Sequence, residues 1–356
     1  MPRWPVDLNV EEHAAPAAMA DVYRAGFAGV IDDPEADGEL YQRMSWPTFA
    51  DVVDSFPFLT KGNGSTRLPG VVEDGLYLPF LAQLKCEAIA AGVSGSLADL
   101  SRDSRLRPWP EAQFVGDCVS HFVRNICDLL RCQEICNGEP EAFITRGATE
   151  PIYGHRNHRG HGASCSRLLA FVSTVGGMFL RQELEIPNFG KLDLRKYNPT
   201  IGTKWGASGV PSAVCNFGKP YQIQDVTRCN TRNEIILAFQ NGLPVGGCSS
   251  MGFSSDRNEC GASKPRSTWR HAMAWSGLDI RPSTLERYPS GLVLIQQSWG
   301  TWNRGPREIH DTPYLIPDGA FWADLGHVER NAGGFYAIAG ANGWQLPPLE
   351  TLGASW

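Results

Sequence analysis

No segment constrains the fold of this chain more than the one that begins at Asp117 and reads DCVSHFVRNICDLLR. Its apolar residues recur at intervals of three and four, which predicts an amphipathic helix with one apolar stripe. These residues are Val119, Phe122, Val123, Ile126, Leu129 and Leu130. Gly116 ends the preceding segment and Asp117 is a favourable N-cap residue, so we expect Cys118 in the first helical turn.

Helices and strands are predicted in different halves of the chain. Further helices are expected at residues 17–30, 46–56, 78–91 and 164–175, the last closed by Gly176-Gly177. After Lys191, short strand-like runs alternate with turns, at residues 221–226, 244–248, 271–278, 291–297 and 320–325. Helices followed by strands predict an α+β fold with segregated halves rather than a doubly wound sheet.

Charge is spread unevenly along the 356 residues, whose net charge is −6. Up to Arg107 there are nine Lys/Arg against sixteen Asp/Glu, and the remainder is about neutral. We therefore expect residues 1–107 to form an acidic N-terminal extension, ending in the proline-bounded run SRDSRLRPWP. The acidic balance argues against a nucleic-acid partner, and no apolar run is long enough for a membrane partner.

The first twenty residues lack the basic start and apolar core of a secretory signal. This predicts a chain that is cytoplasmic at synthesis, in a reducing compartment. The ten cysteines are therefore expected to be free thiols rather than a disulfide framework. Cys127, Cys132 and Cys136 could gather around a metal, but their spacing fits no common zinc pattern, so buried packing is the favoured interpretation.

Cys118 is the candidate nucleophile. A cysteine attacks as its thiolate, and a helix N-terminus lowers the pKa of a thiol. A nucleophile of this kind needs a base held in one orientation. His271, in the strand-like run HAMAWSGL, is the candidate base, and Gln297 could orient its imidazole. His121 is a rival base one turn along the same helix, although a partly exposed helix residue is the simpler interpretation.

These residues resemble the motifs of the papain-like cysteine peptidases. In that family a Gly-x-Cys opens the central helix, a His-Ala pair lies in the strand-rich half, and an Asn-Ser-Trp-Gly motif follows. Here they are matched by Gly116-Asp117-Cys118, by His271-Ala272 and by Gln297-Ser298-Trp299-Gly300. The resemblance runs from Gln113 to Trp322, in the family's order. It implies a two-lobed domain over residues 108–356, with a helical lobe at 108–190 and a strand-rich, barrel-like lobe at 191–356.

The chain departs from the family pattern at three places. The family has its oxyanion glutamine six positions before the nucleophile, where this chain has Ala112, with Gln113 one place closer. The orienting amide is Gln297 rather than asparagine. Val115 replaces a family cysteine, so that disulfide is absent. Losing one oxyanion donor typically costs roughly 100- to 1,000-fold in rate.

The resemblance implies thiolate acyl transfer on a peptide or protein substrate, with no metal or organic cofactor. Cys118, His271, Gln297 and Gln113 would be catalytic residues. Gly160 and Gly162 would border the substrate cleft, and Trp299 would shield the histidine. The acidic extension would be either a pro-segment or a docking unit for a protein partner.

Other interpretations stay open. Histidines 155, 158 and 161 in YGHRNHRGHGASC could bind a metal, or a phosphate with Arg156 and Arg159, although a long loop is the simpler interpretation. The run IPDGAFW at residues 316–322 resembles divergent papain-like proteins encoded by some bacteriophages. This implies an alternative function, a catalytically impaired structural or assembly protein in a phage virion. A transglutaminase-like or peptide-ligating enzyme is a third hypothesis.

Overall fold

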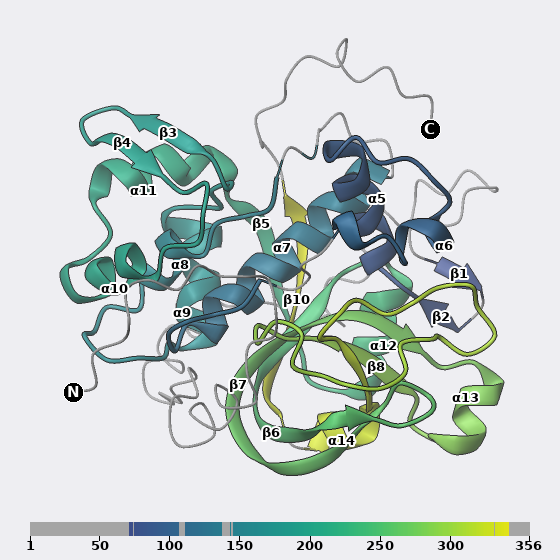
Figure 1. The fold of residues 1–356 in the computed structure, drawn as a ribbon. Coiled ribbons are helices and arrows are strands. Elements are labelled where there is room, and N and C mark those ends of the chain that lie inside the picture. The colour runs from purple at the N-terminus through teal and green to yellow at the C-terminus, as the bar shows by residue number, and fades with distance from the viewer. Residues whose placement is uncertain are drawn as a thin grey trace.

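The structure is a computed structural model that describes residues 71–73, 75–106, 111–136, 143, 145–330 and 332–341. The helices predicted at 17–30 and 46–56 lie outside these residues. Figure 1 shows one group of helices at the left, a curved sheet at the lower right, and a long helix, α7, between them. The segregated α+β arrangement expected from the sequence is confirmed.

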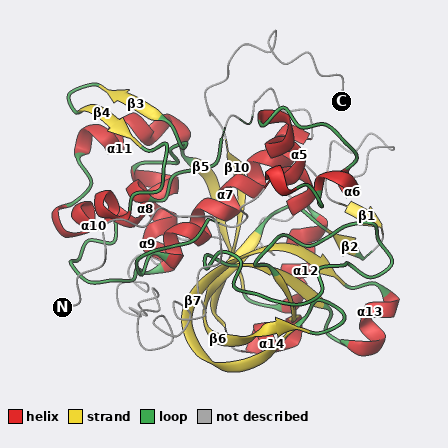
Figure 2. Ribbon diagram, viewed as in Figure 1, coloured by secondary structure: helices red, strands yellow, loops and turns green. Residues whose placement is uncertain are grey.

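The main sheet has eight strands, all paired antiparallel, in the part of the chain that the structure describes. They are β1 (Val71–Glu73), β2 (Leu76–Tyr77), β5 (Ile223–Cys229), β6 (Val245–Arg257), β7 (Ser263–Asp279), β8 (Leu292–Gln296), β9 (Phe321–Asp324) and β10 (Ala332–Ala341). The order is β1-β2-β7-β6-β10-β5, and β8 pairs with both β7 and β9. The sheet curves strongly (Figure 2), but its described strands do not close into a barrel.

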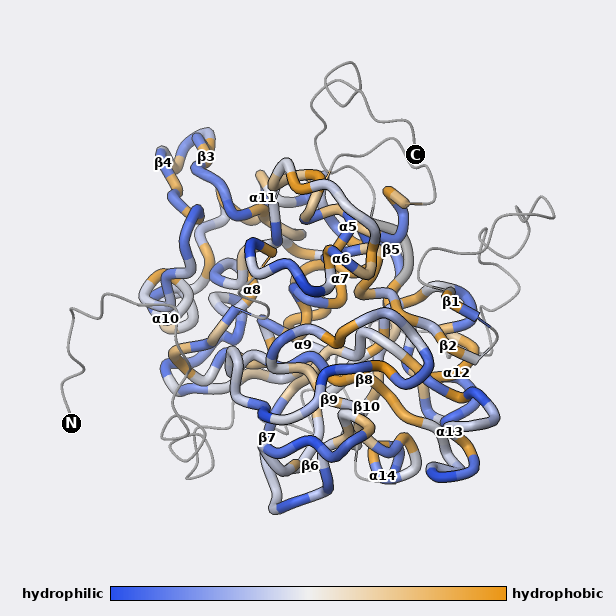
Figure 3. The backbone as a smooth tube through the Cα atoms, turned by 45° about the vertical axis from the view of Figure 1, so that its right-hand side comes forward, coloured by the Kyte–Doolittle hydropathy of each residue, from blue (hydrophilic) through white to orange (hydrophobic). Residues whose placement is uncertain are grey.

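Five of these strands overlap the five that the sequence predicts, and the remaining three are additions. Successive side chains of β8 point to opposite faces of the sheet, which explains why its sequence is a nearly continuous apolar run. Val293 and Ile295 point into the cluster inside the curved sheet, whereas Leu292 and Leu294 join a second cluster with Trp322. Both faces of β8 are therefore buried, which in a strand of period two requires apolar residues on both faces. Figure 3 colours the backbone by hydropathy and draws most of this strand as hydrophobic.

The helices fall into a larger group beside α7 and a few around the sheet. The first group comprises α5 (Phe80–Ala90), α6 (Leu97–Leu100), α8 (Glu150–Gly154), α9 (Cys165–Ala170) with its π-helical continuation (Phe171–Val175), α10 (Pro199–Ser208) and α11 (Ser212–Gly218). The second comprises α12 (Arg232–Gln240), α13 (Pro282–Arg287) and α14 (Leu325–Arg330). A hairpin of β3 (Glu183–Ile186) and β4 (Gly190–Asp193) packs with α10 and α11. None of the described helices has both the length and the apolar character needed to cross a bilayer.

Helix α7 (Cys118–Cys136) begins at the residue that the sequence predicts and packs on β6, β7 and β10. The predicted apolar stripe is present, but neither face of the helix is exposed, because every residue from Cys118 to Ile135 is buried. The apolar stripe meets the sheet. The polar face is also covered by residues outside the helix. Arg124 lies 3.5 Å from Glu111, Arg131 donates to the Thr145 carbonyl oxygen (2.5 Å), and Asp128 accepts from the Gly147 N–H (3.0 Å).

Gly246 explains how closely α7 approaches the sheet. A Cβ placed there would lie 2.6 Å from the Phe122 ring and 2.6 Å from the carbonyl oxygen of Met273. Glycine in a strand interior costs conformational entropy. At this position it permits the helix to seat its buried phenyl ring directly on the strand.

Residues 75–106, which the sequence places in the acidic extension, share a core with the rest of the chain. Strand β2 pairs with β7, and α5 packs against α7. Leu76, Leu84 and Leu106 belong to the same cluster as Leu129 and Trp322. Charge imbalance reflects the surface residues of a segment and not its core packing. It therefore does not make residues 75–106 a separate unit. Residues 1–70 lie outside the described residues, and the role predicted for the extension stays a prediction.

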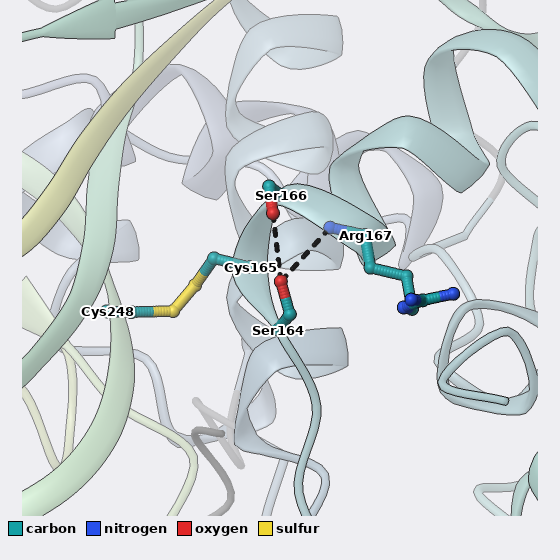
Figure 4. Close-up of a disulfide and its surroundings, with 5 residues drawn as sticks. All are labelled: Ser164, Cys165, Ser166, Arg167 and Cys248. Carbon is teal, nitrogen blue, oxygen red and sulfur yellow. Dashed lines mark hydrogen bonds between the residues drawn. A yellow bond between two sulfur atoms is a disulfide. The ribbon is translucent and has the colours of Figure 1, made fainter. Parts of the chain in front are cut away.

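Cys165 and Cys248 form a disulfide between α9 and β6, with Cα atoms 6.4 Å apart (Figure 4). The expectation of free thiols is wrong for this pair, because the fold brings together two cysteines that lie 83 positions apart. The other cysteines in the described ranges form no disulfide. Ser164 caps α9 by accepting a hydrogen bond from Arg167 N (3.4 Å), as expected for a helix that starts near this serine.

Candidate functional site

Cys118 is the first residue of α7 and is fully buried. The loop before it lies against the glycine-rich segment, where the Gly162 N–H donates to the Gly116 carbonyl oxygen (2.9 Å). A Cβ on Gly116 would lie 2.9 Å from the Cβ of His161, so only glycine allows this approach. Gly162 is therefore bonded to the residue that lies two positions before the candidate nucleophile, and its role at a substrate cleft stays a prediction.

His271 lies on β7, opposite Ser249 of β6, and is also buried. Its Nε2 atom has no hydrogen-bond partner among the described residues. Burial lowers the pKa of His271 to about 3, with a smaller contribution from the nearby charge of His121. The imidazole is therefore neutral at neutral pH, the form that can accept a proton.

Trp299 covers His271. The pairing of β7 with β8 ends at Ala274 and Gln296, and Trp299 follows three residues beyond the end of β8. The two rings stack with centroids 4.4 Å apart and planes inclined by 27°. The two rings are in contact, and the shielding role of Trp299 stays a prediction.

Gln297 does not hydrogen-bond to His271 in the part of the chain that the structure describes. Its Oε1 accepts from the backbone N–H of Trp299 (2.6 Å), and its Nε2 donates to the Gly319 carbonyl oxygen (3.3 Å). The motif lies beside the histidine, but its amide is bonded to the backbone. The orienting role of Gln297 stays a prediction.

Gln113 joins the motif that contains Gln297. Its backbone N–H donates to the Ser298 carbonyl oxygen (2.8 Å), and the Ser298 hydroxyl donates to its Oε1. Its Nε2 donates to the Val115 carbonyl oxygen (2.8 Å). The structure thus connects the segment before Cys118 with the segment after β8, and one of the two N–H groups of the Gln113 amide has a backbone acceptor.

A buried polar cluster beside Cys118 was missed from the sequence. The Tyr197 hydroxyl donates to Asp117 Oδ2 (2.7 Å), and His121 Nε2 lies 3.5 Å from the same oxygen. His121 Nδ1 lies 3.4 Å from Arg124 Nη2. The expectation that His121 is partly exposed is wrong, because it is fully buried between these two groups. The Asp117 side chain also makes no capping bond, since Oδ2 serves Tyr197 and Oδ1 has no partner among the described residues.

Tyr153 is a second residue that sequence reasoning missed. It is buried, and burial raises the pKa of its phenol above the usual value, with smaller contributions from the nearby Asp117 and Cys118. A neutral phenol is therefore placed near the nucleophile. Tyr197 lies in none of the motifs, and Tyr153 begins the histidine-rich run but had no role predicted there, so only the three-dimensional arrangement identifies them.

Buried ion pairs hold the segment that leads to the site. Glu111 lies 3.5 Å from Arg124 and 2.9 Å from Arg181, and Arg181 also binds Glu150 (2.7 Å). Burial alone would raise the pKa of Glu111, but the two guanidinium charges outweigh it and lower this pKa to about 2. The pairs tie the chain two residues before Gln113 to α7 and to α8.

The histidine-rich loop does not gather its histidines around one point. No group of three His, Cys, Asp or Glu side chains within the described ranges has the placement of a metal site. Arg156 is buried and donates to the carbonyl oxygens of Tyr153 (3.1 Å), Gly160 (3.0 Å) and Gly202 (2.8 Å). Its guanidinium therefore holds the loop in shape, which leaves it unsuited to the phosphate alternative.

No protein-family model matches the chain, and no curated protein matches it. The fold is similar to several solved structures. Xylellain, a cysteine protease from Xylella fastidiosa, is 15% identical over 66% of this chain and 84% of its own, with a TM-score of 0.42. Procathepsin L 3 from the larval midgut of Tenebrio molitor is 11% identical over 67% of this chain and 68% of its own (TM-score 0.38). The ragweed pollen allergen Amb a 11, a cysteine protease in its proform, is 11% identical over 90% and 79% (TM-score 0.41).

Proposed function

We propose that this chain is a papain-like cysteine peptidase or amidase in which Cys118 is the nucleophile and His271 the base. One observation supports the proposal: three segments far apart in the sequence, which carry Cys118, His271 and Trp299, pack together. Helix α7 begins at Cys118 and packs on β7, which carries His271. The segment after β8 contributes Trp299, whose ring stacks on His271.

The reaction would proceed by acyl transfer. The Cys118 thiol gives its proton to His271, and Sγ attacks the carbonyl carbon of an amide, so that the carbonyl oxygen becomes an oxyanion. His271 then protonates the departing amine as the C–N bond breaks, which leaves a thioester on Cys118. Water gives a proton to His271 and attacks the thioester, and Cys118 departs with the proton returned.

The oxyanion would be held by the backbone N–H of Cys118 and the side-chain amide of Gln113. One N–H of Gln113 Nε2 is bonded to the Val115 carbonyl oxygen, so the oxyanion would use the second N–H of this amide. Gln297 Oε1 accepts from the Trp299 N–H, and it would orient His271 by accepting a second hydrogen bond. Each would require only a small side-chain rotation, which we expect substrate binding to bring about.

Burial sets a further requirement. Cys118 is 0% exposed and His271 1% exposed, so a substrate reaches them only after neighbouring side chains move. A histidine with a pKa of about 3 is a weak base. Entry of a polar substrate, together with the negative charge of the Cys118 thiolate, would raise that pKa and favour the thiolate–imidazolium pair.

Hydrolysis of a peptide library by the purified chain tests the proposal. We expect turnover that is lost in Cys118→Ala and in His271→Gln, and retained in Cys215→Ala, whose cysteine is free and lies on α11. Hydrolysis that persists in Cys118→Ala would reject this cysteine as the nucleophile. Adding an amine and analysing the products separates hydrolysis from peptide ligation.

A second candidate is favoured by the same burial and by the backbone bonds of Gln113 and Gln297. It is a papain-like structural or assembly protein without catalytic activity, of which a phage virion component is one form. It predicts no turnover of any peptide by the chain or its variants. It also predicts that the chain sediments as part of a larger assembly.

A further inference from the structure

A cavity of about 620 Å³ lies in the helical group, between the end of α8, the α9 region and α11. Its volume falls in the range of small-molecule sites, roughly 300–1,000 Å³. The charged side chains that line it are Arg167 and Lys219, and no carboxylate is among the lining residues. Asn157, Asn216 and Ser212 add hydrogen-bonding groups, and Val175 and Val210 add apolar surface.

The sequence around this cavity is strongly biased. Residues 151–182 and 194–224, which supply the whole lining, contain four Lys/Arg each and no Asp or Glu, in a chain whose net charge is −6. Several of these cations have structural partners. Arg156 serves carbonyl oxygens, Arg181 binds Glu111 and Glu150, and Arg195 binds Asp193.

Arg167 and Lys219 are different, because neither has an ion pair among the described residues. In Figure 4 the Arg167 side chain points away from the disulfide. His155, which also lines the cavity, lies close enough to Arg167 for that charge to contribute to its depressed pKa. Two cations without acidic partners therefore face one cavity whose remaining polar groups can donate hydrogen bonds.

We infer that this cavity binds a small polyanion, a molecule with carboxylate or phosphate groups that pair with Arg167 and Lys219. A guanidinium binds such oxyanions with two parallel hydrogen bonds, and the ammonium adds a second charge. The asparagine amides and the Ser212 hydroxyl would complete the coordination, and the valines would contact the body of the molecule. Binding at this site does not require the chemistry of Cys118.

Isothermal titration of the full chain with citrate and with inorganic pyrophosphate tests the inference, at constant ionic strength. Citrate represents carboxylates and pyrophosphate represents phosphates, so the stronger ligand identifies the preferred group. We expect saturable binding of at least one probe. Arg167→Gln and Lys219→Gln should each weaken it roughly ten- to a hundred-fold, because each removes a charge-assisted contact.

Lys204→Gln is the matched control, since Lys204 is exposed on α10 and does not line the cavity. It removes the same charge from the same group of helices and should leave binding unchanged. The His155 ring resonances provide a second readout. Burial and then Arg167 lower the pKa of His155 to about 4, so a bound anion should raise it. That rise should shrink in Arg167→Gln.

Two results would overturn the inference. One is the absence of saturable binding of either probe up to roughly 10 mM, a concentration that detects even millimolar affinities. The other is binding that Lys204→Gln weakens as much as the two cavity variants do, which would reveal general charge attraction. Circular dichroism of each variant establishes that it is folded before the titration.

Discussion

Removing the Cys165–Cys248 disulfide should lower the free energy of unfolding by an amount that depends on how far apart the two cysteines lie in the sequence. The cross-link closes a loop of 83 positions. In the chain-entropy treatment the unfolded state loses 2.1 + 1.5R ln n cal/mol/K, which for this loop is about 15 cal/mol/K, or about 4.5 kcal/mol at 25 °C. Because α9 and β6 are otherwise held by packing, we expect the reduced chain to fold but to unfold at lower denaturant.

Urea unfolding with and without reductant measures this difference in the same polypeptide. With a slope of roughly 3 kcal/mol/M, the reduced chain should unfold at a midpoint lower by about 1.5 M. The double variant Cys165→Ala/Cys248→Ala should match the reduced chain and should not respond to reductant. Cys215→Ala, which removes a free cysteine, should respond to reductant as the natural chain does.

Two findings would refute this reasoning. The first is a midpoint that does not change on reduction, while peptide mapping establishes that the bond was present beforehand. The second is a double variant that still loses stability in reductant, which would assign the effect to other cysteines.

Three further predictions concern side chains around the site. His271→Gln should reduce the pH dependence of stability. Between pH 6.5 and about 3 the unfolded chain holds a proton on this histidine that the folded chain lacks, so acidification lowers the free energy of unfolding by about 1.4 kcal/mol per pH unit. Urea midpoints across that window should show the variant with the shallower slope, and an equal slope would contradict the burial of this imidazole. Gly246→Ala should cost about 1–3 kcal/mol in thermal or urea unfolding because its Cβ has no space, whereas Gly160→Ala, where a Cβ meets only His158 at 3.4 Å, should be close to neutral. Equal losses in these two variants would show that the approach of α7 is not the cause. Tyr197→Phe should cost roughly 1.5–3 kcal/mol, since it leaves the buried Asp117 carboxylate without its 2.7 Å donor, and an unchanged stability would show that the carboxylate is satisfied in another way.

Local periodicity was enough to predict the start of α7 and the positions of five strands. The spacing of Val119, Phe122 and Ile126 specifies a helical stripe wherever the helix lies in the fold. The same reasoning failed for the polar side of α7. Arg124 and His121 read as surface residues because their partners, Glu111 and Tyr197, come from other parts of the chain.

Motif order located the candidate site but not its hydrogen bonds. The motif match predicts that the Gln297 amide bonds to His271, yet it is Trp299, three residues beyond the end of β8, whose ring stacks on this histidine. Register depends on bulges and pairing that a motif does not encode. The disulfide was missed for a related reason, since the pairing of ten cysteines depends on which strand and helix come together.

The account is tested most directly by identifying which cysteine reacts with a peptide-like epoxide inhibitor directed at thiols. Cys118 is 0% exposed, whereas Cys136, Cys215 and Cys260 are partly exposed. If Cys118 is an activated nucleophile that a substrate can reach, mass mapping should find the adduct on Cys118 in the natural chain and find it lost in His271→Gln. Labelling distributed over the partly exposed cysteines, with Cys118 unmodified, would contradict the proposed peptidase site.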